Sequence, residues 1–197
     1  MDKEEQTEAI KVPPIEQIRE ELAREEAKHG FRKTIGNIAV ALLVAAAVTA
    51  LVATRLFVLI RINGGSMEPT LADGEIIFLR QTKEIKTGDL VGFYYGGRVL
   101  IKRVIASAGD SVDMGQDGSV YVNGKKLDEP YVKEKSLGKC ELEFPYEVPE
   151  GMSFVLGDNR AISIDSRIRS IGSVERDQIV GKVVFRAWPL SRMGIMR

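Results

Sequence analysis

The sequence predicts a mainly β domain, a barrel or a sandwich, that follows a single N-terminal transmembrane helix. One apolar run, residues 35–60, carries a single charge. After it come short runs rich in β-branched and aromatic residues, separated by glycine turns such as "YGGR" and "VNGKK", a pattern typical of β-hairpins. The length of 197 residues suits one domain with attachments.

Residues 1–34 are dense in charge, and we expect them to form a cytoplasmic tail. Within "PPIEQIREELAREEAKHG", Ile15, Ile18 and Leu22 share one helical face. Proline opens this stretch and glycine closes it, in line with the preferences of helix ends. A short solvated helix or tail is favoured, and docking to a partner is the alternative.

Residues 35–60 are long and apolar enough to cross a bilayer as a helix. Arg55 lies near the end of the run, where its guanidinium can reach the headgroups. A cleavable secretory signal has a shorter apolar region closer to the N-terminus, so we expect a retained single-pass anchor in the cell membrane. Basic residues precede the run, which favours a cytoplasmic N-terminus and an extracytoplasmic domain over residues 61–197.

Composition excludes several functions. Lysine plus arginine equals aspartate plus glutamate, at 28 each, so no global charge points to nucleic acid. The single cysteine, Cys140, can form neither an internal disulfide nor a zinc cluster. We expect neither a metal nor an organic cofactor. We expect the protein to be a monomer. Residues from about 129 to 151 are rich in proline, glycine and charge and predict a looser insertion.

The stretch "GGSMEPTL" at residues 64–71 places Ser66 behind two glycines, which leave its hydroxyl unshielded. A serine hydroxyl needs a base to become a nucleophile. The only histidine, His29, precedes the apolar run and would lie across the membrane from Ser66, which excludes a Ser-His-Asp triad. A Ser-Lys dyad remains.

Lys102 is the best candidate for that base because it interrupts the apolar run "VLIKRVI". Alternation along a strand puts Leu100, Lys102 and Val104 on one face and Arg103 on the other. Apolar neighbours favour the neutral amine, which is the form that can accept a proton. Taken alone, a strand lysine is more often a solvated edge residue.

A polar loop, "GDNRAISIDSR" at residues 157–167, follows the apolar run "MSFVL". A strand that ends in such a loop can bring polar groups to a site. The alternative is a solvent-facing loop stabilised by Asx turns and an ion pair between Asp165 and Arg167.

Together these stretches resemble type I signal peptidases of the Gram-positive kind, which are membrane-bound serine endopeptidases. The likeness lies in "GGSMEPTL", "IKRVIASAGD", "YVNGK", the "GDNR...S.DSR" pattern and "IVGKVVFRAWPLSRMG", and it covers roughly residues 35–197. The resemblance implies a signal-peptidase-like β-domain. It also implies removal of signal peptides from exported preproteins after small residues, typically Ala-X-Ala, with preproteins and the lipid bilayer as partners.

The resemblance also implies roles for individual residues. Ser66 would be the nucleophile and Lys102 the general base, with the Ser163 hydroxyl orienting the lysine. Asp165 and Arg167 would form a structural ion pair, and Asp158 and Arg160 would support the same loop. The candidates for lining the substrate pocket are Ile62, Met67, Leu71, Leu100 and Ile101.

One position departs from some members of the family. Gly64 stands where those members have a serine whose hydroxyl helps to bind the oxyanion. The oxyanion would then depend on the Ser66 amide together with another backbone group or a water, because losing one donor costs about a hundredfold to a thousandfold in rate.

Two other functions remain open at this level. The self-cleaving domain of LexA-type repressors shares Ser-Lys chemistry, although a DNA-binding domain, not a membrane anchor, would precede it. A membrane-anchored β-domain that binds export substrates without cutting them is the non-enzymatic alternative.

Overall fold

A computed structural model describes residues 14–196, except for the side chains of residues 25–27, 29 and 53. Residues 1–13 of the expected tail lie outside this range. The chain forms two compact units that divide between Val52 and Ala53.

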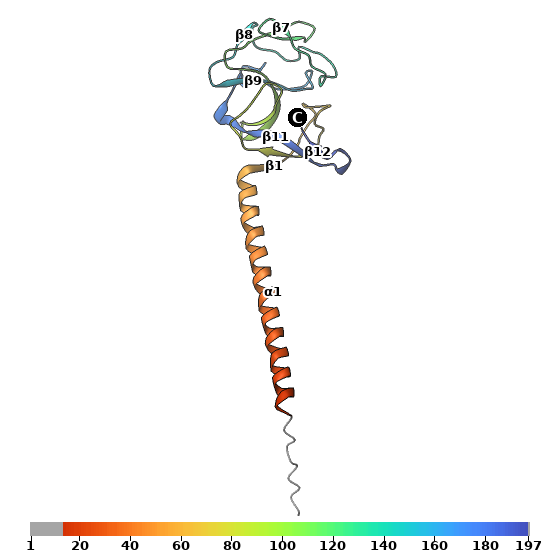
Figure 1. Ribbon diagram of the computed structural model, residues 1–197. Coiled ribbons are helices and arrows are strands. Elements are labelled where there is room, and N and C mark those ends of the chain that lie inside the picture. The colour runs from red at the N-terminus through yellow and green to blue at the C-terminus, as the bar shows by residue number, and fades with distance from the viewer. Residues whose placement is uncertain (1–13, 197) are drawn as a thin grey trace, which may run out of the picture. The chain divides into compact units, whose positions relative to one another are not determined.

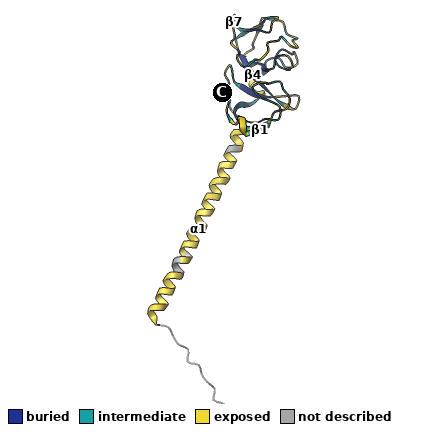
Figure 2. Cartoon of the chain, turned by 90° about the vertical axis from the view of Figure 1, so that its right-hand side faces the viewer, coloured by how far each residue is buried: buried dark blue, intermediate teal, exposed yellow. Residues whose placement is uncertain are grey.

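The first unit is helical. Helix α1 spans Ile15–Leu56, and its segment Gly30–Leu56 has a mean hydropathy of 2.4 and the length needed to cross a membrane. None of the residues in its most apolar window is buried (Figure 2). A long exposed apolar helix of this kind favours lipid as its surroundings.

The helix differs from the predicted membrane span at its C-terminal end, and it includes the stretch of the tail in which a short helix was expected. It begins within the expected tail and ends at Leu56, whereas the apolar run predicted a helix to residue 60. Residues 57–61 instead form strand β1, because each of them pairs with a residue of strand β2. An apolar run alone does not distinguish a helix from a buried strand, and here the neighbouring strand decides.

The second unit is built of β-strands, so the prediction of a mainly β fold with one N-terminal helix is confirmed (Figure 1). Two single-turn 3₁₀ helices, η1 (Arg176–Gln178) and η2 (Leu190–Arg192), interrupt its C-terminal part. The strands are β1 Phe57–Arg61, β2 Ile76–Arg80, β3 Leu90–Tyr95, β4 Arg98–Ser107, β5 Ser111–Met114, β6 Val120–Val122, β7 Lys125–Lys126, β8 Tyr146–Glu147, β9 Met152–Leu156, β10 Val174–Glu175, β11 Ile179–Trp188 and β12 Gly194–Ile195.

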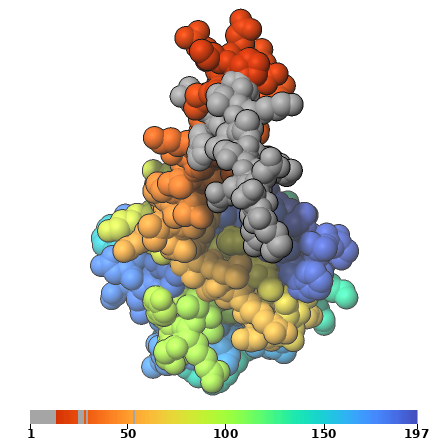
Figure 3. Space-filling model, turned by 90° about the horizontal axis from the view of Figure 1, so that it is seen from below, coloured from red at the N-terminus to blue at the C-terminus, as the bar shows by residue number. Residues whose placement is uncertain are grey.

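The strands make two antiparallel sheets. The larger has the order β1-β2-β11-β3-β4-β9-β10, with β12 paired to β11, and the smaller has the order β7-β6-β5-β8. Strand β11 has register shifts where it pairs with β2 and β3, as β-bulges produce. In the view of Figure 3, the C-terminal residues and residues near position 95 appear on the same face of this unit.

Three clusters of buried apolar residues form the core of this unit, and Figure 2 colours its buried residues dark blue. One cluster contains Leu71, Ile77 and Leu79 and lies beside the serine-bearing loop. Another contains Val112, Val120 and Phe154 and joins the small sheet to strand β9. The loops that connect these strands therefore begin and end on packed sheets.

The segment 129–151 contains one short strand, β8, and is otherwise irregular. It is nevertheless anchored to the loop 157–167. The backbone carbonyl of Leu137 accepts a 2.6 Å hydrogen bond from Arg167 Nη1, and the Glu141 amide donates a 2.8 Å bond to the Arg167 carbonyl.

Candidate active site

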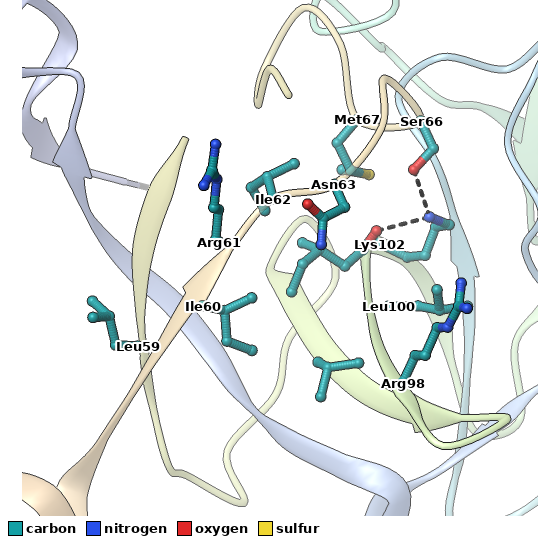
Figure 4. A pocket seen from close by; sticks show the side chains of 12 residues that line it. Leu59, Ile60, Arg61, Ile62, Asn63, Ser66, Met67, Arg98, Leu100 and Lys102 are labelled. Atoms are coloured by element: carbon teal, nitrogen blue, oxygen red, sulfur yellow. Dashed lines mark hydrogen bonds between the residues drawn. The ribbon is translucent and has the colours of Figure 1, made fainter. Parts of the chain in front are cut away.

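An open groove of about 590 Å³ runs across the second unit. Residues 59–63 line one side, residues 98–102 line the other, and Ser66 and Met67 lie at one end (Figure 4). Most of the lining is aliphatic, with Arg61 and Arg98 as its exposed cations.

Each long side of the groove is a strand that is paired on one edge, and its other edge faces the groove without a partner strand among the described residues. Within residues 14–196, strand β1 pairs only with β2. The first half of β4 pairs only with β3, because β9 does not begin to pair with β4 until Arg103. Free edges offer unpaired backbone N–H and C=O groups, and an extended peptide can join such edges as an added strand.

Ser66 lies in the loop between β1 and β2, where backbone contacts fix its position. Gly64 adopts a φ of 88°, which a residue with a side chain rarely adopts, and its amide donates a 2.7 Å bond to Asp73 Oδ1. The Asn159 amide donates a 3.1 Å bond to the Ser66 carbonyl, and Asn159 Nδ2 donates a 3.2 Å bond to the Gly65 carbonyl. The polar loop at 157–167 therefore holds the serine loop in place.

Lys102 reaches Ser66 from strand β4. Its Nζ lies 2.9 Å from Ser66 Oγ and 2.9 Å from the carbonyl oxygen of Ile101, and both bonds are drawn in Figure 4. Only 2% of Lys102 is exposed. Burial lowers the pKa of Lys102 from 10.5 to about 8, against the opposing effect of the Asp165 and Asp158 carboxylates. A substantial fraction of the amine is therefore neutral near pH 8.

The loop 157–167 packs against this pair through Gly157. A Cβ atom added to Gly157 would lie 2.1 Å from Ser163 Oγ and 2.6 Å from the Ser66 carbonyl oxygen. Only glycine at position 157 leaves room for Ser163 Oγ and the Ser66 carbonyl oxygen to lie this close to the backbone. Ser163 Oγ is buried and has no hydrogen-bond partner among residues 14–196, so the structure shows no bond from Ser163 to Lys102.

Two fully buried charges stabilise the same loop. Arg167 Nε lies 2.8 Å from Asp165 Oδ1, and neither side chain is exposed. Asp165 Oδ2 also accepts a 3.0 Å bond from the Gly157 amide. The Asp165 carboxylate therefore links Arg167 to Gly157, the residue that contacts both Ser163 and Ser66.

Asp158 joins the three sequence motifs. Its carboxylate receives 2.9 Å and 2.7 Å bonds from Arg103 Nε and Nη2, and it accepts a bond from the hydroxyl of Thr70. Arg103 follows Lys102 in β4, and Thr70 belongs to the serine loop. The sequence placed Arg103 on the face opposite Lys102, and burial of its guanidinium against Asp158 satisfies both charges.

Four of the five predicted pocket residues, Ile62, Met67, Leu100 and Ile101, line the groove. The prediction for Leu71 is wrong, because this side chain is fully buried in the core cluster beside Ile77 and Leu79. The Leu71 amide donates a 2.9 Å bond to the Met67 carbonyl, a turn that directs Leu71 into the core.

Sequence reasoning missed other groove residues. Leu59 and Ile60 line the groove but were placed within the transmembrane helix, although the β-branched and aromatic run "FVLIRI" was a signal for a strand. Asn159 was not singled out, although it supports the serine loop through both its backbone and its side chain.

The described residues contain no group of three or more His, Cys, Asp or Glu side chains that could hold a metal ion. Cys140 is half-buried, with its Sγ 3.6 Å from the Leu142 carbonyl oxygen. Cys140 is not among the residues that line the groove.

A serine hydroxyl that contacts a buried lysine beside an open groove is an arrangement found in serine hydrolases. Comparison with known proteins agrees with this class. Residues 35–188 match the family described as "Signal peptidase, peptidase S26".

Curated relatives carry the same description. Signal peptidase IB of Staphylococcus aureus is 40% identical over 150 residues, which covers 66% of this chain and 77% of the relative. Signal peptidase I of Bacillus licheniformis is 36% identical over 171 residues, which covers 78% of this chain and 88% of the relative. A crystal structure of a signal peptidase I from Enterococcus faecalis aligns with 50% of this chain and 96% of its own, with 31% identity and a TM-score of 0.43.

The chain therefore belongs to the signal peptidase family, and the resemblance seen in the sequence is confirmed. It is a hydrolase, a serine endopeptidase of the class that removes signal peptides.

Proposed function

We propose that this chain is a membrane-anchored signal peptidase I in which Ser66 is the nucleophile and Lys102 the general base. The observation that carries the proposal is the 2.9 Å contact between Ser66 Oγ and the buried Lys102 Nζ at the end of an open groove. A nucleophile needs a base within hydrogen-bond reach, and a lysine serves as that base only when burial makes its neutral form accessible.

The chemistry follows from this pair. As Ser66 Oγ bonds to the scissile carbonyl carbon, neutral Lys102 accepts the hydroxyl proton. The lysine then gives that proton to the nitrogen of the leaving segment, the peptide C–N bond breaks, and an ester to Ser66 remains. A water attacks the ester and transfers a proton to Lys102, and collapse of this second intermediate returns a proton to Ser66.

The oxyanion needs hydrogen-bond donors near Ser66. The Ser66 amide is free to serve, because no described group accepts a hydrogen bond from it. Gly64 supplies no hydroxyl, so a second donor comes from another backbone group or from water. Such donors lower the barrier because they are already oriented where negative charge develops.

Ser163 and the buried charges act as support in this proposal. The Ser163 hydroxyl is assigned to orienting Lys102, although it makes no bond to Lys102 in this structure. Its buried oxygen has no other hydrogen-bond partner among the described residues and is therefore available for this role. The Asp165–Arg167 pair holds the loop, and Asp158 joins that loop to β4 through Arg103.

The proposed substrate is an extended peptide with small residues one and three positions before the cut. Two free strand edges flank the groove, so a substrate strand can pair with both. Side chains at alternate positions of a strand point to the same side, so both small residues would face the same aliphatic surface. We assign that surface to Ile62, Met67 and Ile101, which pack in one cluster, whereas Leu100 lines the groove from the other face of β4. Such a surface would exclude larger side chains.

The helix Gly30–Leu56 is the proposed membrane anchor. In this proposal the N-terminus lies in the cytoplasm and the β unit lies on the extracytoplasmic side of the membrane. The preprotein carries its own apolar signal segment in the same bilayer. Holding both molecules in one membrane raises their effective concentration.

The test is cleavage of a preprotein with an Ala-X-Ala site by the detergent-solubilised full chain, with the cut located by mass spectrometry. Tryptophan replaces the residue at position −1, −2 or −3 before the cut in three substrate variants. We expect the −1 and −3 variants to resist cleavage and the −2 variant to be cut. Equal cleavage of all three would contradict the proposed specificity.

The same assay separates the alternatives. A self-cleaving domain would convert its own chain and leave the preprotein intact. A binding module would retain the preprotein without cutting it.

A further inference from the structure

Arg160 is a cation with no access to solvent, and its charge is balanced from outside the three motifs. Both Arg160 and Glu129 have fully buried side chains, and they form a two-point ion pair. One contact joins Arg160 Nη2 to Glu129 Oε1, and the other is a 3.3 Å bond from Nη1 to Oε2. A buried guanidinium without such a partner is strongly unfavourable.

Glu129 comes from the irregular segment between β7 and β8, far in sequence from the loop that it contacts. Tyr131, two residues later, donates a 3.4 Å bond to Glu129 Oε1. The ring of Tyr131 also lies against Arg103, with 3.9 Å between the guanidinium carbon and the ring centroid. Residues 129–131 therefore contact both the polar loop and the arginine that follows Lys102.

The ion pair reaches the catalytic pair through Gly157. Arg160 Nε donates a 3.1 Å bond to the Gly157 carbonyl. Gly157 is the residue that contacts both Ser163 Oγ and the Ser66 carbonyl, with no space even for a methyl group. A shift of Arg160 therefore moves the surface against which Ser163 and Ser66 are placed.

We propose that Glu129 is a positioning residue for catalysis. Its carboxylate fixes Arg160, and Arg160 holds Gly157 and Ser163 in register with the Ser66–Lys102 pair. Glu129 touches neither substrate nor the reacting atoms. The inference rests on the proposed function, because it assigns Glu129 to the geometry of that same site.

The test replaces Glu129 with glutamine, which keeps the size and removes the charge. Glu134→Gln is the matched control, since Glu134 is an exposed carboxylate of the same segment with no ion pair among the described residues. We expect kcat per folded enzyme to fall about tenfold to a hundredfold, because small misplacements of reacting groups have effects of this size. KM should change by less than about twofold, since Glu129 lies outside the groove.

Two readouts separate positioning from a loss of folded protein. The pH at which kcat/KM reaches half its plateau should move in Glu129→Gln, since Lys102 would no longer sit against a fixed loop. The double variant Glu129→Gln with Ser163→Ala should be no slower than Ser163→Ala alone, because both changes act on the same hydroxyl. An unchanged pH profile together with fully multiplicative rate effects would overturn the proposal.

If Glu129→Gln does not fold, the pair Glu129→Met with Arg160→Met replaces two buried charges with apolar side chains of similar length, an exchange that cores tolerate. This folded variant should still be slow, because Arg160 Nε no longer binds Gly157. Wild-type kcat in it would refute the positioning role.

Ser66→Ala is measured in parallel. If Ser66→Ala is inactive while folded Glu129→Gln has wild-type kcat, this inference alone fails. If Ser66→Ala still cleaves, the proposed function fails.

Discussion

The pH dependence of cleavage reports directly on Lys102. Burial gives this lysine a pKa of about 8, and only its neutral form accepts the Ser66 proton. About one tenth of the amine is then neutral at pH 7, about half at pH 8 and about nine tenths at pH 9. We therefore expect kcat/KM to rise about tenfold from pH 7 to pH 9 and then to level off.

The magnitude separates this lysine from an ordinary one. A lysine with a pKa near 10.4 gains roughly tenfold in neutral form per pH unit, about a hundredfold between pH 7 and pH 9, with no plateau there. The plateau, rather than the rise itself, is thus the signature of the buried site.

The assay follows cleavage of a short internally quenched peptide by the solubilised full chain, at substrate concentrations far below KM. Under that condition kcat/KM reports the pKa of the free enzyme. Circular dichroism at each pH verifies the fold. With chemistry shown to be rate-limiting, a flat profile from pH 6 to pH 10 would refute lysine as the base, and a rise with no plateau would refute the lowered pKa.

Further predictions concern the loop 157–167. Gly157→Ala should reduce kcat by at least about a hundredfold, because the new methyl group displaces Ser163 and the Ser66 carbonyl; Gly194→Ala, where an added Cβ meets nothing within 4 Å, should retain wild-type kcat in the same assay. Asp165→Asn should lower the free energy of unfolding by about 3–5 kcal/mol in urea titration, because Arg167 loses its buried partner, and unchanged stability would contradict this. In any folded Asp165→Asn enzyme the pH profile should move to lower pH, because the Asp165 carboxylate raises the pKa of Lys102.

Much of the fold could be predicted from local pattern. The apolar run after a charged tail predicts a membrane helix, and glycine turns between short β-rich runs predict the β unit. The end of the helix could not be predicted this way. Residues 57–60 are as apolar as the helix before them, and only their pairing with Ile77 to Arg80 makes them a strand.

The site was predictable where chemistry limits the choice. With His29 expected on the far side of the anchor, Ser66 needed another base, and Lys102 was the lysine flanked on its own strand face by the apolar residues Leu100 and Val104. The structure brings their side chains together across 36 residues of sequence. Contacts that depend on tertiary packing were not accessible, since nothing near Glu129 in the sequence indicates that its carboxylate meets Arg160.

Leu71 also shows that tertiary packing is hard to predict from sequence, because it was expected in the pocket but lies in the core. Its place five residues after the nucleophile favoured the pocket, but the turn from Met67 to Leu71 directs the side chain into the core. Proximity in sequence does not determine which side of a loop a residue faces.

The most direct test of the account is the rate of preprotein cleavage by Ser66→Ala and by Lys102→Met at pH 9, each with its fold verified by circular dichroism. Methionine keeps most of the volume of the lysine and cannot accept the proton. We predict that both variants lose cleavage at the signal-peptide bond while remaining folded. Wild-type cleavage at that bond by either variant would contradict the assignment of Ser66 and Lys102 as nucleophile and base.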